Sequence, residues 1–386
     1  MTRPAGRRLY LDVLRGIAVL IMMEAHIVDS WTHLSARASK AFGESLILGG
    51  FGAPLFLFLA GIAVPLSGGS KARRLGDDAA AARLVEKRGL QIFLLAFLFR
   101  LQAVVISRSP LWTLLKVDIL NIMGPAIAGT AYLWGRFRSP RARCMAFAVA
   151  TAAIALATPI VRGMTWLGAF PPFLQGYFRP VPGWTNFTFF PWAAFVTGGA
   201  MIGTLLDAAR NPRAETRVNV WLAASGVAIG GAAYGASFLP SLYAHSSFWT
   251  SSPCFFFLRA GIMTVSVALA FAWGLPFATG VAESTPDERR GGGALTALVR
   301  WCGGGVWRVL VLLGRSSLFI YWIHVEMVYG VMSMPLHHAL TLSESWIGLA
   351  LFSAFMVGCA VAKDRVKAWW RQRPIRGRPL APQSVG

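Results

Sequence analysis

Charged residues are scarce in this sequence, and acidic ones especially so. Only 14% of the 386 residues are charged, 55% are hydrophobic, and the mean hydropathy is +0.55. Soluble domains carry about 25% charged residues. The composition therefore argues against a water-soluble globular protein, and it excludes a disordered chain and a collagen-like repeat.

Cysteine is also rare. The four cysteines stand singly at positions 144, 254, 302 and 359, mostly inside or beside apolar runs. No two have the spacing that binds zinc or builds a disulfide framework. The zinc-protease helix motif, the phosphate loop and the dinucleotide fingerprint are missing as well. We therefore expect inert thiols, no metal site and no soluble-enzyme active site.

The chain instead contains ten long apolar runs, each with the roughly 20 residues that a helix needs to cross the ~30 Å hydrocarbon layer. Their approximate ranges are 9–30, 46–67, 88–107, 118–135, 144–162, 189–207, 218–238, 254–279, 309–334 and 346–362. No connection is suited to a soluble domain, since the longest, near 280–308, is glycine-rich and charged. The sequence predicts an all-α integral membrane protein, a bundle of about ten transmembrane helices.

Positive charge alternates between the connections. The chain has 37 Lys and Arg against 16 Asp and Glu, a net charge of +21, which in a soluble domain would suggest nucleic acid. Here the basic residues lie in short gaps between apolar runs, where they mark cytoplasmic ends. Counted from a cytoplasmic N-terminus, cytoplasmic segments hold 27 Lys and Arg, and outer segments hold 6. We therefore expect both termini in the cytoplasm and no nucleic-acid partner.

This topology divides the chain into three parts. Residues 1–8 form a basic cytoplasmic N-terminus, residues 9–362 a ten-span membrane domain, and residues 363–386 a basic cytoplasmic tail expected to be disordered. Arginine outnumbers lysine 31 to 6, which fits a GC-rich bacterial genome. We therefore expect a multi-pass protein of the bacterial inner membrane.

The first span carries the densest set of polar residues. Ionisable groups inside a membrane helix cost about 2.5 to 3.5 kcal/mol each and are functional candidates by default. Asp12, Arg15, His26 and Ser30 fall on one stripe, with Arg15 and His26 roughly 16 Å apart along the axis. Glu24 points about 160° away from His26, so it needs a partner from another helix. We interpret the Arg15 and His26 stripe as functional.

A second cluster lies between Gly314 and Glu326. Ser317, Tyr321 and His324 share one face of the predicted ninth span. The first and ninth spans run in the same direction, so His26 and His324 are expected at similar depth, in one cavity. For His324 a structural hydrogen bond between helices and a site role both stay open.

Three further charges are candidates within the membrane. Arg100 and Asp118 lie in the same halves of adjacent spans, and Arg259 lies near the outer mouth of the eighth span. Structural ion pairing between helices is the favoured interpretation for these residues. Arg259 is nevertheless grouped with Glu24 and Asp29 as a candidate for binding the acceptor substrate.

Aromatic residues concentrate in one outer segment. Between Trp166 and Trp192, 10 of 27 residues are aromatic, against 12% in the whole chain. An interfacial belt accounts for part of this excess. The remainder, including Trp184 and Trp192, is expected to wall a pocket and stack on a sugar ring or lipid head.

Several of these stretches resemble the transmembrane acyltransferase superfamily, and in particular the bacterial relatives of heparan-α-glucosaminide N-acetyltransferase. The matching stretches are Arg8–His26, Gly52–Gly61, Phe190–Phe195 and Leu313–His324. The most specific feature is an arginine, ten intervening residues and a histidine, which match Arg15 and His26. The resemblance implies a bundle of ten or eleven spans that moves an acyl group from cytoplasmic acyl-CoA to a hydroxyl or amine of a glycan or lipid beyond the membrane. The lysosomal enzyme's histidine lies in a loop, whereas His26 lies in a span, so the acceptor is not carried over.

Residues and resemblance together suggest a mechanism. Acetyl-CoA or another acyl-CoA would be attracted to a basic cluster and to Arg15 at a tunnel mouth. The cluster comprises Lys71, Arg73, Arg74, Lys87 and Arg88. His26 would take the proton of the acceptor, and His324, with Tyr321 and Ser317, would orient His26 or stabilise the oxyanion. An acyl-histidine intermediate is less favoured.

Two other classes of function remain open. In a proton-coupled secondary transporter, Arg15, Glu24, His26 and Glu326 would form a substrate or proton path. Evident inverted repeats and paired broken helices are missing from the sequence, which argues against this class. A non-catalytic membrane scaffold would tolerate loss of the whole stripe.

Overall fold

The computed structural model describes residues 7–279 and 294–372, and its regular structure is helical. The helices are α1 (Leu9–Trp31), α2 (Lys40–Gly49), α3 (Gly52–Leu75), α4 (Asp78–Ile106), α5 (Ile119–Arg136), α6 (Pro140–Gly163), α7 (Pro172–Gln175), α8 (Phe189–Ala208), α9 (Pro212–Ala236), α10 (Pro253–Thr279), α11 (Ala294–Arg315), α12 (Ser317–Tyr329) and α13 (Leu342–Gln372). Extended backbone pairs only at two isolated bridges in these ranges, Thr32 with Leu340 and Val117 with Thr185. The prediction of an all-helical membrane protein is confirmed.

The number of candidate spans is smaller than predicted. Within the described ranges, seven helical segments are long and apolar enough to cross a membrane, or eight if α11 and α12 count as one. Two expected spans are absent from that set: α1 is interrupted by four charged residues, and α5, which contains Asn121, Pro125 and Arg136, is not apolar enough. Both are well-formed helices with many residues buried against other helices.

The expected straight span over 309–334 is wrong. The chain bends by 81° between α11 and α12, at Ser316. Ser316 is buried, and its hydroxyl accepts a hydrogen bond of 2.6 Å from Nζ of Lys363 on α13. Gly314 lies directly against α1, because a Cβ atom there would meet the carbonyl oxygen of Asp12. The bend therefore carries α12 along α1 in a new direction.

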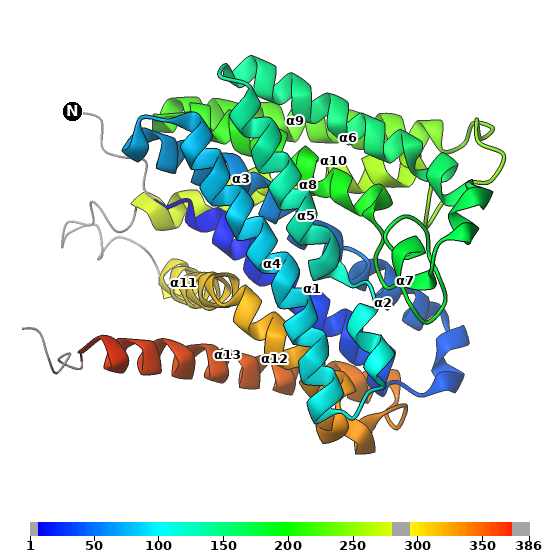
Figure 1. Ribbon diagram of the computed structural model, residues 1–386. Coiled ribbons are helices and arrows are strands. Elements are labelled where there is room, and N and C mark those ends of the chain that lie inside the picture. Colours follow the sequence, from blue (N-terminus) through cyan, green and yellow to red (C-terminus); the bar gives the residue numbers. More distant parts are fainter. Residues whose placement is uncertain (1–6, 280–293, 373–386) are drawn as a thin grey trace, which may run out of the picture.

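Helix α1 lies at the centre of the bundle. Val13, Ala18, Val19 and Met23 are fully buried, and α1 packs against α2, α3, α10, α11, α12 and α13 (Figure 1). A central helix can carry charged side chains because they face other helices and cavities instead of lipid. The polar stripe predicted for this helix therefore lies inside the protein.

Small residues permit close packing around this centre. Helices α3 and α8 touch at Gly61 and Gly199, where a Cβ atom would collide with the backbone carbonyls of Val196 and Phe58. Glycine at such contacts lets two membrane helices approach closely and pack by van der Waals contact. This contact between α3 and α8 fixes the position of α3, which carries Ser67 and Lys71 in its C-terminal part.

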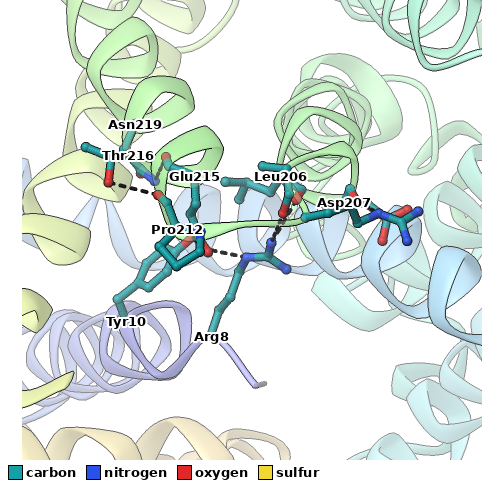
Figure 2. Close-up of polar contacts among 10 residues, drawn as sticks. Arg8, Tyr10, Leu206, Asp207, Pro212, Glu215, Thr216 and Asn219 are labelled. Carbon is teal, nitrogen blue, oxygen red and sulfur yellow. Dashed lines mark hydrogen bonds and ion pairs between the residues drawn. The ribbon is translucent and has the colours of Figure 1, made fainter. Parts of the chain in front are cut away.

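Polar contacts tie the start of α1 to the turn between α8 and α9 (Figure 2). Arg8 donates to Oε1 of Glu215 at 2.7 Å and to the carbonyl oxygen of Leu206 at 2.8 Å, and the Tyr10 hydroxyl donates to the same Glu215 oxygen at 2.8 Å. Arg73 of α3 pairs with Asp207 at 3.0 Å. We call this end of the molecule, with Arg8, Arg73 and Arg315, the basic end, and the opposite end the histidine end.

The described termini lie on the same side of the molecule. Helix α1 begins and α13 ends at the left of Figure 1. Their cytoplasmic location stays a prediction. Helix α13 continues to Gln372, so residues 363–372 are helical, contrary to the expected disorder; the rest of that segment and residues 1–6 lie outside the described ranges.

Candidate active site

Two histidines from distant parts of the chain meet at the histidine end. Nδ1 of His26 on α1 lies 3.0 Å from Nε2 of His324 on α12, and the rings stack at 5.1 Å between centroids. His324 is fully buried, and His26 is half-buried. The predicted meeting of these residues is therefore present.

The hydrogen bonds of His324 define a direction for this pair. Its Nδ1 lies 2.8 Å from the carbonyl oxygen of Ile320, which can only accept, so Nδ1 is the protonated nitrogen. When both rings are neutral, Nε2 of His324 then accepts from Nδ1–H of His26. This leaves Nε2 of His26 as a lone-pair acceptor, and the part of the chain that the structure describes gives it no hydrogen-bond partner.

A second ring lies beside His26. Tyr329, at the end of α12, contacts it edge-on at 5.4 Å, and the tyrosine hydroxyl donates to Oδ2 of Asp29 at 3.1 Å. Asp29 also accepts from Arg37 at 3.0 Å. Asp29 was predicted to bind substrate, whereas these contacts make it a partner of Tyr329 and Arg37. Tyr329 was missed, because it lies off the helix face that Ser317, Tyr321 and His324 share.

Tyr321 and Ser317, the two residues predicted to act with His324, lie in different surroundings. Tyr321 is buried, meets His324 edge-on at 6.0 Å and packs on Phe99 at 5.4 Å. Ser317 lies seven residues before His324, about 10 Å along α12. Tyr321 can thus orient His324, while Ser317 belongs to a different cavity.

That cavity, which we call the chamber, has a volume of about 300 Å³ and lies toward the basic end. Its cationic lining residues are Arg15 of α1, Lys71 of α3 and Arg88 of α4, and Ser67 and Ser317 supply hydroxyls. Aliphatic side chains such as Val64, Ile92 and Ile127 complete the wall. Cations at the mouth and an apolar interior fit the phosphates and pantetheine arm of a coenzyme A thioester.

Arg15 is held at the chamber by a buried carboxylate. Asp12 is 2% exposed and accepts from Arg15 at 3.2 Å and from Arg7 at 2.6 Å, with Arg315 at 3.8 Å. The Asp12 carboxylate raises the pKa of Arg7. Three guanidinium groups around one carboxylate leave a positive excess beside the chamber, which attracts an anion.

The other predicted cofactor-binding residues lie differently. Arg74 and Lys87 are exposed, and neither lines the chamber, although Arg88 next to Lys87 does. Lys87 points about 100° away from Arg88 on α4. That Arg74 and Lys87 bind acyl-CoA stays a prediction. They belong to the surrounding basic surface.

The chamber and the histidine pair are separated by packed side chains. Neither His26 nor His324 lines the chamber. Between Arg15 and His26 on the α1 stripe stand Val19 and Met22, which are 0% and 5% exposed. A thioester held at Arg15 therefore reaches His26 only when this apolar layer opens.

Glu24 and Arg259, two other predicted substrate contacts, lie away from the histidine pair. Glu24 is 2% exposed and its carboxylate oxygens have no hydrogen-bond partner; Nε of Arg259 is likewise buried without one. The Arg259 guanidinium lies 3.9 Å from the centroid of the Phe255 ring. The expectation of a partner for Glu24 on another helix is not met within the described residues.

Trp184 and Trp192 have structural contacts. Trp184 packs on Trp112 at 4.9 Å, and its carbonyl oxygen accepts from the backbone N–H of Val117. Trp192 packs on Phe187 at 4.7 Å and against the core. Neither contacts the histidine pair among the described contacts. Arg100 and Asp118 form the predicted ion pair, at 2.6 Å.

The fold and this site define a class: a multi-pass helical membrane protein with a cationic chamber and a buried histidine pair. Residues 7–235, more than half of the chain, match the family model of the heparan-alpha-glucosaminide N-acetyltransferase catalytic domain, and the chain belongs to this family of membrane acetyltransferases, which use acetyl-CoA. The match includes α1 to α9 and ends before His324. A search of curated proteins finds no match.

Proposed function

We propose that the protein transfers an acyl group, in the simplest case acetyl, from acyl-CoA at the basic end to a hydroxyl or amine of a glycan or lipid at the histidine end. The observation that carries this proposal is the His26 and His324 pair, which leaves one imidazole nitrogen free to accept a proton. By the distribution of Lys and Arg, the basic end faces the cytoplasm of a bacterial inner membrane.

The donor side of the proposal depends on the chamber. Arg15, Lys71 and Arg88 present three cations that pair with the phosphates of the coenzyme, and the apolar wall accommodates the pantetheine arm. A chamber of about 300 Å³ takes this arm and leaves the nucleotide at the surrounding basic surface. The ~16 Å between Arg15 and His26 is then the path of the arm toward the histidine end.

The chemical step needs one base. The acceptor oxygen or nitrogen attacks the thioester carbonyl carbon, a C–O or C–N bond forms, and the C–S bond breaks. Nε2 of His26 takes the acceptor's proton and returns it to the sulfur, so that free coenzyme A leaves as a thiol. His324 holds the His26 ring in position and in the required tautomer, which is the orienting role and not the oxyanion role.

The apolar layer regulates this encounter. Val19 and Met22 keep water away from the thioester until the arm displaces them. Exclusion of water protects an activated acyl group from hydrolysis. We therefore expect low thioester hydrolysis in the absence of acceptor.

The transporter alternative receives less support. It needs Arg15, Glu24, His26 and Glu326 along one path. In the structure the Glu326 carboxylate accepts from the Ser107 hydroxyl, and Glu24 lies against Gly49 on another side of α1. The described part has one bent helix pair, whereas inverted repeats favour two.

Membrane vesicles that contain the protein provide the test. Acetyl-CoA labelled in the acetyl group is added on the basic side, and glycans and lipids are then examined by mass spectrometry for the label. The proposal predicts one acetyl mass added to an acceptor only when the chain is present. Membranes with correctly inserted protein and no labelled glycan or lipid would contradict it.

A further inference from the structure

A second cavity lies on the other side of α1. This groove has a volume of about 490 Å³ and runs between α1, the junction of α2 and α3, and α10. Its lining is apolar apart from the hydroxyl of Ser266, and it includes Ile17 and Ile21 of α1, Phe51 before α3, and Ile262 and Trp273 of α10. Ile17 and Ile21 belong to the central helix yet are only half-buried, so the groove leaves α1 uncovered. In a membrane, hydrocarbon covers such a surface.

The length of the groove fits one leaflet. On α10 it extends from Ile262 to Trp273, a span of twelve residues and about 16 Å. The hydrocarbon layer of a bilayer is ~30 Å thick, so one leaflet contributes about 15 Å. A single acyl chain therefore matches the groove in length and polarity.

Two charged side chains continue the groove toward the histidine end. Arg259 stands three residues before Ile262 on α10, and Glu24 stands three residues after Ile21 on α1, so each lies on the face that lines the groove. Both lie against the glycine pair between Leu48 and Phe51. A Cβ atom at Gly49 would be 2.9 Å from Oε2 of Glu24, and one at Gly50 would be 3.1 Å from Nη2 of Arg259.

These two side chains have buried polar atoms without hydrogen-bond partners and are not paired with each other among the described residues, although the Arg259 guanidinium packs on the Phe255 ring. Neither oxygen of Glu24 has a partner among the described residues, nor has Nε of Arg259, although all three atoms are buried. A buried charge without a partner is costly, and a ligand removes that cost. The site offers a cation and an anion side by side, above an apolar groove.

We propose that the groove binds one zwitterionic glycerophospholipid with a primary ammonium headgroup. Its phosphate accepts from the guanidinium of Arg259, its ammonium donates to the carboxylate of Glu24, and one acyl chain fills the groove. The lipid is not the acyl acceptor, because Glu24 points about 160° away from His26 on α1. The lipid instead stabilises α1 at Glu24, two residues before His26 on the same helix.

Competition between lipids tests this proposal without any measurement of acyl transfer. The protein is reconstituted in vesicles with equal amounts of phosphatidylethanolamine and phosphatidylcholine of the same chain length, then extracted mildly and examined by native mass spectrometry. Phosphatidylcholine has no N–H on its headgroup. We expect one lipid per chain, with phosphatidylethanolamine favoured about tenfold. Equal retention of the two lipids, or a preference for phosphatidylcholine, would overturn the proposal.

Two variants test the phosphate contact and the ammonium contact of the headgroup separately. Arg259→Met should remove the bound phospholipid, whereas Glu24→Gln should keep it and abolish the preference for the ethanolamine headgroup. Ser266→Trp should fill the groove and exclude both lipids. Lys40→Met and Glu44→Gln are matched controls, since this pair on α2 is 92% and 63% exposed. Unchanged lipid retention and preference in Arg259→Met and Glu24→Gln would overturn the assignment; if these variants do not fold, the wild-type competition still decides it.

Discussion

His26 and His324 lie 298 positions apart in the chain, yet Nδ1 of one is 3.0 Å from Nε2 of the other. Because Nδ1 of His324 faces the carbonyl oxygen of Ile320, the pair has a defined direction that ends at Nε2 of His26. A histidine whose second nitrogen is fixed by a hydrogen bond is the usual form of a general base in enzymes.

The first prediction concerns His324 as a positioning residue. His324→Leu removes the acceptor for His26 Nδ1–H, so we expect kcat to fall by up to about 100-fold while KM for acyl-CoA stays within about twofold. His324→Gln retains an acceptor oxygen and should recover part of kcat. Steady-state kinetics in vesicles measures both. If the apparent kcat fell only in proportion to the folded fraction, and glutamine restored nothing, the role would be structural only.

The second prediction distinguishes two neighbouring cations. Arg88 lines the chamber and Lys87 does not, so Arg88→Met should raise KM for acyl-CoA about tenfold, whereas Lys87→Met should change it little. Arg15→Met should act like Arg88→Met. Binding of coenzyme A by calorimetry checks the order. Equal effects at positions 87 and 88 would mean that only the overall positive field matters.

The third prediction concerns the tyrosine beside His26. Tyr329→Phe keeps the ring contact at 5.4 Å but removes the hydrogen bond to Asp29. We expect a loss of about threefold to tenfold in kcat, in line with the net contribution of one hydrogen bond. Tyr329→Ala also removes the ring and should lose more. The same assay compares the two variants, and a larger loss in the phenylalanine variant would contradict this arrangement.

The fourth prediction concerns stability. The Arg100 and Asp118 side chains are each 13% exposed and pair at 2.6 Å. Arg100→Met leaves a carboxylate in a low-dielectric environment, so we expect about 3–5 kcal/mol of destabilisation and a clear decrease in the thermal unfolding midpoint in detergent. Lys40→Met breaks the exposed pair with Glu44 and should shift the midpoint little. Equal shifts for the two variants would contradict the buried character of the first pair.

The helical class, the Arg100 and Asp118 pair and the encounter of His26 with His324 were predictable from sequence. Apolar length and helical periodicity determine them locally, and the shared direction of two spans places the histidines at one depth. These features depend on position along a single helix or on the order of the helices.

The bend at Ser316, the contact of Tyr329 with His26 and the different positions of Arg88 and Lys87 were not predictable. The bend depends on Lys363 and Asp12 packing against residues from other helices. Helical periodicity places Tyr329 off the face that carries His324. Its contact with His26 depends on how the end of α12 packs against α1. The surroundings of Glu24 were not predictable either, because the partner expected for its carboxylate is missing among the described residues.

The most direct measurement compares acyl transfer by His26→Ala with that by His33→Ala, an exposed loop histidine, in vesicles with equal amounts of inserted protein. Loss of a general base lowers a rate by about 10²–10⁴-fold. We predict a decrease in this range for His26→Ala and wild-type activity for His33→Ala. Acyl transfer at the wild-type rate in His26→Ala would contradict the central role of the histidine pair.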